Sequence, residues 1–240
     1  MNKNSIKNQL TLTGLFLTLG IVYGDIGTSP LYVMKAIVGN RVIDAGLVLG
    51  GISCVFWTLT FQTTLKYVLI TLRADNHGEG GIFSLYALIR RRAKYLFIPA
   101  ILVGSFLLSD GIITPAISVT SSIEGLKILN PHIPVVPIVI LILLILFVIQ
   151  RFGTKILGNT FGFVMFFWFV MLAVLGLPQI FQTPEILKAL NPWYAFHLLS
   201  TYPSGFFILG AVFLCTTGAE ALYSDLGHCG KNNIQISWIF

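Results

Sequence analysis

The sequence predicts an all-α membrane protein that crosses the bilayer several times. Of its 240 residues, 55% are hydrophobic and only 10% are charged, whereas a soluble domain usually has about a quarter of its residues charged. A helix that crosses the hydrocarbon core needs about 20 mostly apolar residues. Six such stretches, which we number spans one to six, form a single transmembrane domain over residues 1–240: roughly 11–38, 46–71, 95–121, 134–150, 156–176 and 204–229.

The basic residues predict which side of the membrane holds the N-terminus. With the N-terminus inside, ten Lys and Arg fall in inner segments: Lys3, Lys7, Arg73, Arg90, Arg91, Arg92, Lys94, Arg151, Lys155 and Lys231. Four fall in outer segments: Lys35, Arg41, Lys127 and Lys188. Because cytoplasmic loops carry the excess of positive charge, we expect a cytoplasmic N-terminus in a cell membrane. The first apolar stretch is too long for a cleaved signal peptide, and Asp25 interrupts it.

Span one contains polar residues where lipid would be expected on every side. The stretch Gly20–Tyr32 carries Asp25, together with Gly24, Gly27 and Pro30. A carboxylate at membrane depth costs at least a few kcal/mol, so it faces protein, water or a bound cation. Non-helical backbone at that depth is tolerated only where it lines a cavity. These features predict a cation site on a broken helix.

Spans three and six carry the other two acidic residues near span midpoints. Asp110 lies in span three, where Gly111 and Pro115 predict a kink. In span six, Thr217 and Glu220 are three residues apart and would share one face of a continuous helix. Two glycines of span six, Gly218 and Gly227, are candidate points of unwinding.

The two interrupted spans predict an internal symmetry. Span one runs from inside to outside, and span six runs in the opposite direction. Corresponding broken spans separated by five crossings are typical of inverted-topology repeats, which place their substrate site at the midplane. The chain would then hold a first five-span repeat and span six. After Asn233, the apolar run 234–240 resembles entry into a seventh span, so we expect the chain to be part of a longer protein.

The midplane chemistry favours a monovalent cation. No Lys or Arg lies at the midpoints of the spans to neutralise Asp25, Asp110 and Glu220, so either protons or a cation must compensate their charge. Hydroxyl groups from Thr28, Tyr32 and Thr217 and carbonyls freed by the breaks would replace the hydration shell of an alkali ion. No cluster of His and Cys accompanies them, which argues against a transition metal. The alternative is structural: a membrane carboxylate can also cap a neighbouring helix.

Two connecting segments also carry signals. In the inner loop, Asn76–Gly81 is typical of a turn, and the apolar residues that follow predict an interfacial helix ending at Arg90–Arg92. We interpret that end as a contact with anionic lipids rather than a partner protein. The outer loop 178–203 places Trp193, Tyr194 and Tyr202 at the interface.

Four motifs resemble the KUP/HAK/KT family of potassium uptake permeases. They are Gly24-Asp-Ile-Gly-Thr-Ser-Pro-Leu-Tyr32, Asn76-His-Gly-Glu-Gly-Gly81, Ser109-Asp-Gly-Ile-Ile-Thr-Pro115 and Thr217-Gly-Ala-Glu-Ala-Leu-Tyr-Ser-Asp-Leu-Gly-His228. The resemblance implies a LeuT-type inverted-repeat bundle that imports K⁺, typically together with H⁺. It implies a transporter rather than an enzyme, with no cofactor.

Carried onto this chain, the resemblance makes five residues the K⁺ pocket or its proton-coupling groups: Asp25, Tyr32, Asp110, Thr217 and Glu220. Members of the family are longer, with a complete second repeat and a cytoplasmic C-terminal domain, so the chain corresponds to an N-terminal portion. Two other functions stay open, an amino-acid permease on the same scaffold and a truncated protein that does not transport. The oligomeric state stays open between a monomer and a homodimer.

Overall fold

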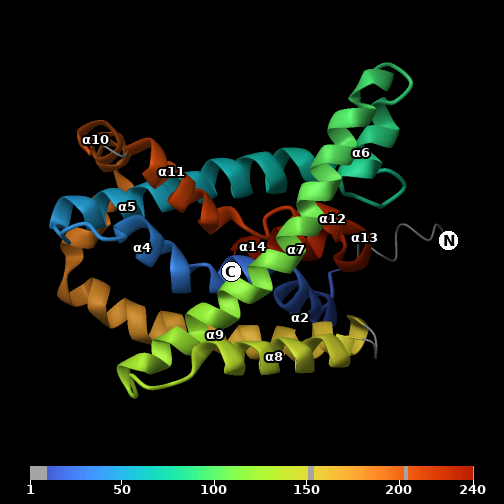
Figure 1. Ribbon diagram of the computed structural model, residues 1–240. Helices are drawn as coiled ribbons and strands as arrows, with labels where there is room; N and C mark the ends of the chain where they lie inside the picture. Colours follow the sequence, from blue (N-terminus) through green and yellow to red (C-terminus); the bar gives the residue numbers. More distant parts are fainter. Residues whose placement is uncertain (1–9, 151–153, 203–204, 240) are drawn as a thin grey trace.

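The computed structural model describes residues 10–150, 154–202 and 205–239; their regular elements are helices joined by turns and short connections, with no β-strand among them (Figure 1). Three of the basic residues used above to predict orientation, Lys3, Lys7 and Arg151, lie outside these ranges. Within the described residues, four helical stretches are long and apolar enough to cross a membrane: Ala45–Arg73, Lys94–Ile128, Thr160–Gln182 and Gly205–Ser224. The apolar helices Leu12–Ile21 and Val135–Gln150 are shorter.

Span one is divided into three consecutive helices. They are α2 (Leu12–Ile21), α3 (Tyr23–Thr28) and α4 (Pro30–Val38). The single residues between them, Val22 and Ser29, keep right-handed helical dihedral angles. Pro30 has no backbone N–H and stands at the start of α4, where a missing donor costs least. The predicted interruption is therefore present, but it is a change of hydrogen bonding rather than an extended segment.

Span two changes its helical type midway. The helix α5 (Ala45–Thr58) starts at Asp44, whose carboxylate accepts a hydrogen bond of 2.7 Å from the backbone N–H of Leu47. The π-helix η1 (Leu59–Ile70) and the short 3₁₀ turn η2 (Thr71–Arg73) continue it. Such a long π-helical stretch is rare, and nothing in the sequence pattern predicted it.

The connection between spans two and three and span three itself follow as a helical hairpin. The helix predicted after Gly81 is present as α6 (Ile82–Ile89), and it packs against α7 (Phe97–Gly125), with the turn η3 (Lys94–Leu96) between them (Figure 1). The helix α7 runs without a break through Pro115 and ends in the turn η4 (Leu126–Ile128).

Spans four and five are α8 (Val135–Gln150) and α9 (Thr154–Gln182). The stretch 178–203, predicted as a loop, is mostly helical: it contains the end of α9, the 3₁₀ helix η5 (Pro184–Leu190) and α10 (Trp193–Thr201). The connection between spans five and six thus forms helices of its own, because this stretch packs on α5. The Ser53 hydroxyl donates to the Asn191 carbonyl at 3.0 Å, and the Trp57 indole donates to the Leu190 carbonyl at 3.1 Å.

Span six is the most divided part of the chain. Its first half is α11 (Gly205–Phe213) and the turn η6 (Leu214–Thr216). Its second half consists of two helices of four residues each, α12 (Ala221–Ser224) and α13 (Leu226–Cys229), and α14 (Lys231–Ile239) follows. Gly227, a predicted point of unwinding, lies inside α13; the joint is instead at Gly230, where φ is +79°.

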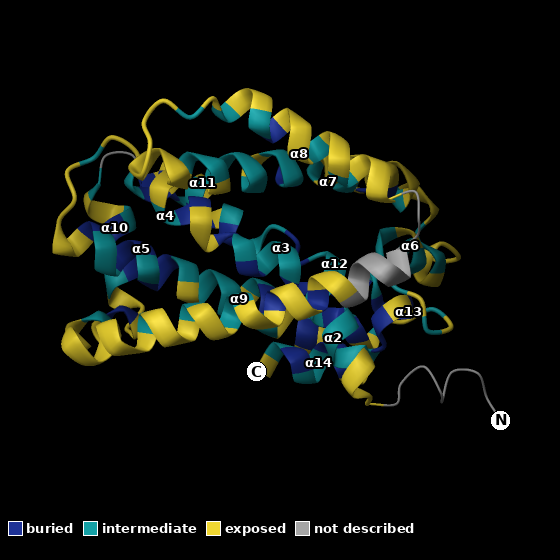
Figure 2. Ribbon diagram, turned by 90° about the horizontal axis from the view of Figure 1, so that it is seen from below, coloured by how far each residue is buried: buried dark blue, intermediate teal, exposed yellow. Residues whose placement is uncertain are grey.

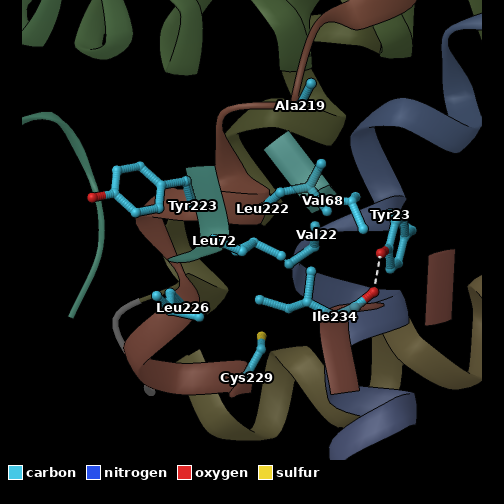
Figure 3. Packing of buried hydrophobic residues seen from close by; sticks show 10 residues of the cluster. All are labelled: Val22, Tyr23, Val68, Leu72, Ala219, Leu222, Tyr223, Leu226, Cys229 and Ile234. Atoms are coloured by element: carbon cyan, nitrogen blue, oxygen red, sulfur yellow. Dashed lines mark hydrogen bonds between the residues drawn. The ribbon is translucent and has the colours of Figure 1, made fainter. Parts of the chain in front are cut away.

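Two buried clusters hold these segments together. One joins span one to the second half of span six through Val22, Leu222 and Ile234, among others (Figure 3). The other joins α4 and α5 to α10 and α11. The helix α9 lies along α2 and α3. Large apolar side chains cover the outward faces of α8 and α9 (Figure 2), as expected for surfaces that face lipid.

Candidate functional site

The break in span six is a complete departure from helical backbone. Thr217 is extended, with φ −57° and ψ +131°, and Gly218 has φ +86°, a conformation that residues with a side chain rarely adopt. Glu220 then lies directly before α12, as its N-cap residue. Thr217 therefore follows η6 and Glu220 precedes α12, so the continuous helix on which they would have shared a face is not present. In the described part of the chain, the Thr217 carbonyl oxygen accepts no backbone hydrogen bond.

The Asp25 side chain of span one lies directly against this break. A Cβ atom placed on Gly218 would be 2.6 Å from the Cβ of Asp25 and 2.7 Å from its Oδ2. Only a residue without a side chain allows this approach, in addition to the positive φ. The glycine thus brings the two interrupted spans together at the Asp25 carboxyl group.

The three midplane carboxyl groups lie near one another. Asp110 acts electrostatically on both Asp25 and Glu220, and Asp25 also acts on Glu220. Within the described residues, the charged side chains that act on Asp25 and Glu220 are all carboxyl groups. All three side chains are only partly exposed. The structure therefore brings together the three carboxyl groups that the sequence predicted to converge, without a compensating Lys or Arg.

One face of α7 supplies hydroxyl groups beside these carboxyl groups. The Thr114 hydroxyl donates to Asp110 Oδ1 at 3.1 Å. Ser118, one further helical turn along, has a buried hydroxyl that lies beside that of Tyr32. Tyr32 is 6% exposed, and its hydroxyl lies 3.1 Å from that of Ser29.

Thr114, Ser118 and Ser29 were not singled out from the sequence. The spacing of Asp110, Thr114 and Ser118 by four residues could have indicated a polar face on an otherwise apolar helix. Ser29 gave no comparable signal.

The backbone of span one is fixed by side chains around its interruption. The hydroxyls of Thr28 and Ser29 donate to the Asp25 carbonyl at 3.0 and 3.2 Å. Trp168 of α9 donates its indole N–H to the Gly27 carbonyl at 2.9 Å. Carbonyl groups near Pro30 thus find side-chain donors, as buried backbone groups require.

The five predicted residues contribute unequally to this arrangement. Asp25, Tyr32, Asp110 and Glu220 are electrostatic neighbours, and Thr217 enters through the backbone break rather than through a shared helix face. Within the described residues, no group of three or more His, Cys, Asp or Glu side chains is arranged to hold a metal ion together. Any cation held here would need hydroxyl and carbonyl oxygens besides the carboxylates.

Comparison with protein families matches residues 12–240 to the K⁺ potassium transporter integral membrane domain. Curated relatives described as probable potassium transport system protein Kup include those of Flavobacterium johnsoniae, 63% identical over 98% of this chain, and Cytophaga hutchinsonii, 64% identical over 100% of this chain. A Kup protein of Enterococcus faecalis is 53% identical over 97% of the chain.

The chain spans little more than a third of these relatives, 36% of the Flavobacterium johnsoniae protein and 37% of the other two, and corresponds to an N-terminal portion. No solved structure matches it. With a family match over nearly its whole length, the chain belongs to the Kup family of potassium transporters, which are multi-pass integral membrane proteins and not enzymes.

Proposed function

We propose that this chain forms the ion-binding half of a secondary active K⁺ importer that carries H⁺ together with K⁺. The observation that supports it best is the contact between Asp25 and Gly218, which joins the two interrupted spans at a cluster of uncompensated carboxyl groups. The named function of the Kup relatives, potassium transport, gives the identity of the cation.

The surroundings of Asp25 suit a dehydrated K⁺ ion. An alkali ion leaving water needs several oxygen ligands to replace its hydration shell. Around Asp25 the structure offers the hydroxyls of Tyr32 and Ser118 and the carbonyl of Thr217. The carboxylate charge would stabilise the cation, because water is displaced and the local dielectric constant is low.

Proton coupling follows from the number of carboxyl groups. One K⁺ ion neutralises one charge, whereas Asp25, Asp110 and Glu220 together carry up to three. Close carboxylates in a low dielectric cannot all ionise, so at least one must hold a proton when a single K⁺ is bound. K⁺ binding and protonation are then linked, which is the requirement for coupling their transport.

The wider architecture we propose is a LeuT-type inverted repeat with a cytoplasmic N-terminus. The division of both span one and span six supports it, since discontinuous helices form the midplane sites of such transporters. An amino-acid permease on this scaffold is less well supported. The Asp25 carboxylate at the break would repel a substrate carboxylate.

The experiment uses a chimera in which this chain replaces the corresponding segment of the Flavobacterium johnsoniae relative. In a K⁺-uptake-deficient strain, Asp25→Asn and Glu220→Gln should lower rubidium uptake at low K⁺ at least about tenfold, equivalent to about 1.4 kcal/mol. The matched control is Glu185→Gln, an exposed carboxylate paired with Lys188 at 3.1 Å, which should leave uptake unchanged. Uptake by both site variants at the level of the unmodified chimera would refute the site.

Two further measurements separate the remaining alternatives. K⁺ pulses should acidify the interior of proteoliposomes that contain the chimera; uptake with no pH change would indicate a uniporter or a channel. Residues 1–240 expressed alone should fail to rescue the deficient strain. Rescue would show that this portion transports by itself.

Anionic lipid is the second partner we propose. Arg90, Arg91, Arg92 and Lys94 are all exposed at the end of α6. Beside them lies an almost wholly apolar cavity of 190 Å³ between α6 and α7, lined among others by Leu85 and Val103. A lipid tail in this cavity would place its headgroup near the arginines. Replacing the three arginines by Gln should abolish the preference for anionic over zwitterionic vesicles.

A further inference from the structure

The motif Asn76–Gly81 lies against the second half of span six, close to the candidate site but not part of it. The Tyr223 hydroxyl of α12 donates to the carbonyl of Ala74, just before the motif. A Cβ atom on Gly80 would overlap the Tyr223 carbonyl oxygen, and one on Gly227 would overlap the Glu79 carboxylate. Glycines on both sides therefore allow a close approach, Gly80 to the backbone of α12 and Gly227 to the Glu79 side chain.

The motif has a fixed shape of its own. Asn76 and Glu79 exchange two backbone hydrogen bonds of 2.9 and 3.1 Å, and the Asp75 carboxylate accepts the Gly78 N–H at 2.9 Å. His77 and Gly78, between them, both have positive φ values. The motif is thus a tight turn that presents a defined surface, not a loose connector.

The segment it touches has little rigidity of its own. The helices α12 and α13 have four residues each, too short to be stable without tertiary contacts. The segment 219–229 is bounded by Gly218 and Gly230, with φ of +86° and +79°. Joints of this kind can absorb a change in backbone direction. What holds the segment in place is its packing on span one and on the chain from Val68 to Gly81 (Figure 3).

We propose that residues 74–81 are a latch that holds segment 219–229 closed, and that this latch must open for K⁺ to pass on the side where it lies. The inference rests on the proposed transport function. Glu220, within the latched segment, belongs to the candidate site. Release of the latch would therefore open a path for K⁺. The same movement would displace Glu220 from the other residues of the candidate site.

A disulfide across the contact tests the proposal directly. A Cβ atom on Gly81 would lie 3.7 Å from the Cβ of Ser224, close to the mean of about 3.8 Å in disulfides. The pair Gly81→Cys and Ser224→Cys is placed in the chimera, with the three native cysteines replaced by Ala. Oxidation should lower rubidium uptake at least tenfold, and dithiothreitol should restore it. Complete cross-linking with undiminished uptake would overturn the proposal.

Single variants separate the failure of the latch from other failures. The variant Gly81→Cys alone shows how much a side chain at φ +88° lowers rubidium uptake without a cross-link. The variant Ser224→Cys alone should take up rubidium normally in the presence of the oxidant. If the unmodified chimera takes up no rubidium, the proposed function fails instead. The proposed latch is then tested by the next measurement, which does not require transport.

Cys229 of α13 is a native reporter of latch opening, because it is buried at 3% exposure. In this chain with Cys54 and Cys215 replaced by Ala, Tyr223→Phe removes the hydrogen bond to Ala74 and keeps the ring. Thiol labelling of Cys229 should become about 2- to 10-fold faster, the effect of losing one hydrogen bond from a closed state. Tyr194→Phe is the matched control and should change nothing. Equal labelling rates for both variants would refute the latch.

Discussion

The two interrupted spans are interrupted in different ways. In span one, both joint residues, Val22 and Ser29, stay in the helical region, and hydroxyl and indole donors bind the carbonyls of Asp25 and Gly27. In span six, Thr217 is extended and Gly218 has φ +86°. Span one thus keeps helical dihedral angles at its joints, whereas span six departs from them completely.

This difference indicates that the two spans have different roles in the candidate site. Span one is fastened by Trp168 of α9, so it is suited to hold Asp25 at a constant position. The second half of span six has short helices between two glycine joints and depends on tertiary contacts. We infer that span one is the stationary wall of the candidate site and that span six is the part that moves.

The most direct test of this difference between the spans is to replace Gly218, the glycine at which they meet. Gly218→Ala would force a side chain into a positive-φ position, which costs about 1–3 kcal/mol, and would press its Cβ against Asp25. We expect the largest effect of the variants discussed below: loss of nearly all rubidium uptake by the chimera and a clear drop in thermal stability.

The control for this variant lies in the same span. A Cβ atom on Gly210 of α11 would meet nothing within 4 Å. Gly210→Ala should therefore leave uptake unchanged and raise helix stability by up to about 1 kcal/mol. If Gly218→Ala behaved like Gly210→Ala, the close approach of Asp25 to the break would be wrong.

A smaller effect is expected from removing the hydrogen bond that holds the backbone of span one at Gly27. Trp168→Phe removes the indole N–H that binds the Gly27 carbonyl, at a cost of about 0.5–1.5 kcal/mol. If span one is the stationary wall, K⁺ affinity should fall while the maximal uptake rate changes little. Trp193→Phe, at a side chain 63% exposed, should alter neither. A fall in the maximal rate with unchanged affinity would place the moving part in span one instead.

The sequence predicted the elements whose physical cause is local. Asp25, Asp110 and Glu220 were recognisable because ionisable residues stand out in an apolar span, and Gly81 with Ile82–Ile89 followed the pattern of a helix start. The structure places Asp25 in α3 and Asp110 in α7, begins α6 directly after Gly81, and places Glu220 directly before α12. The break at Gly218 was also anticipated, because glycine is the residue that a positive φ favours.

What the sequence could not give depends on contacts between distant segments. The packing of α10 on α5 turned a predicted loop into a helix, and the spacing of Thr217 and Glu220 suggested a shared face that the break removes. The contact of Gly80 with Tyr223 joins residues far apart in the chain, and no local pattern encodes it. The spacing of residues in the sequence indicates which side chains share a face of one helix. The candidate site is formed by residues of three different spans.

The smallest expected effect concerns a hydrogen bond at the start of span six. Just before that span, the Tyr202 hydroxyl donates to Asp44 Oδ1 at 2.9 Å, beside the cap of α5. The Leu47 N–H and the Tyr202 hydroxyl hold the pKa of the Asp44 carboxyl below its usual value. Since the pKa is lowered on folding, this contribution to stability is complete above the unfolded value of about 3.9 and is lost as the pH falls through the folded one.

Tyr202→Phe should therefore lower the Tm by no more than a few degrees near pH 6, and the difference from the parent should shrink below about pH 4. Asp44→Asn keeps the acceptor oxygen but does not titrate, so it should flatten that pH dependence. An unchanged pH dependence in Asp44→Asn would mean that another group is responsible. Because Asp44 is exposed, water competes for its hydrogen bonds, so this hydrogen bond should be far weaker than the buried contact at Gly218. The first half of span six would then be held mainly by its packing on α4 and α5, and not by this ionisable contact.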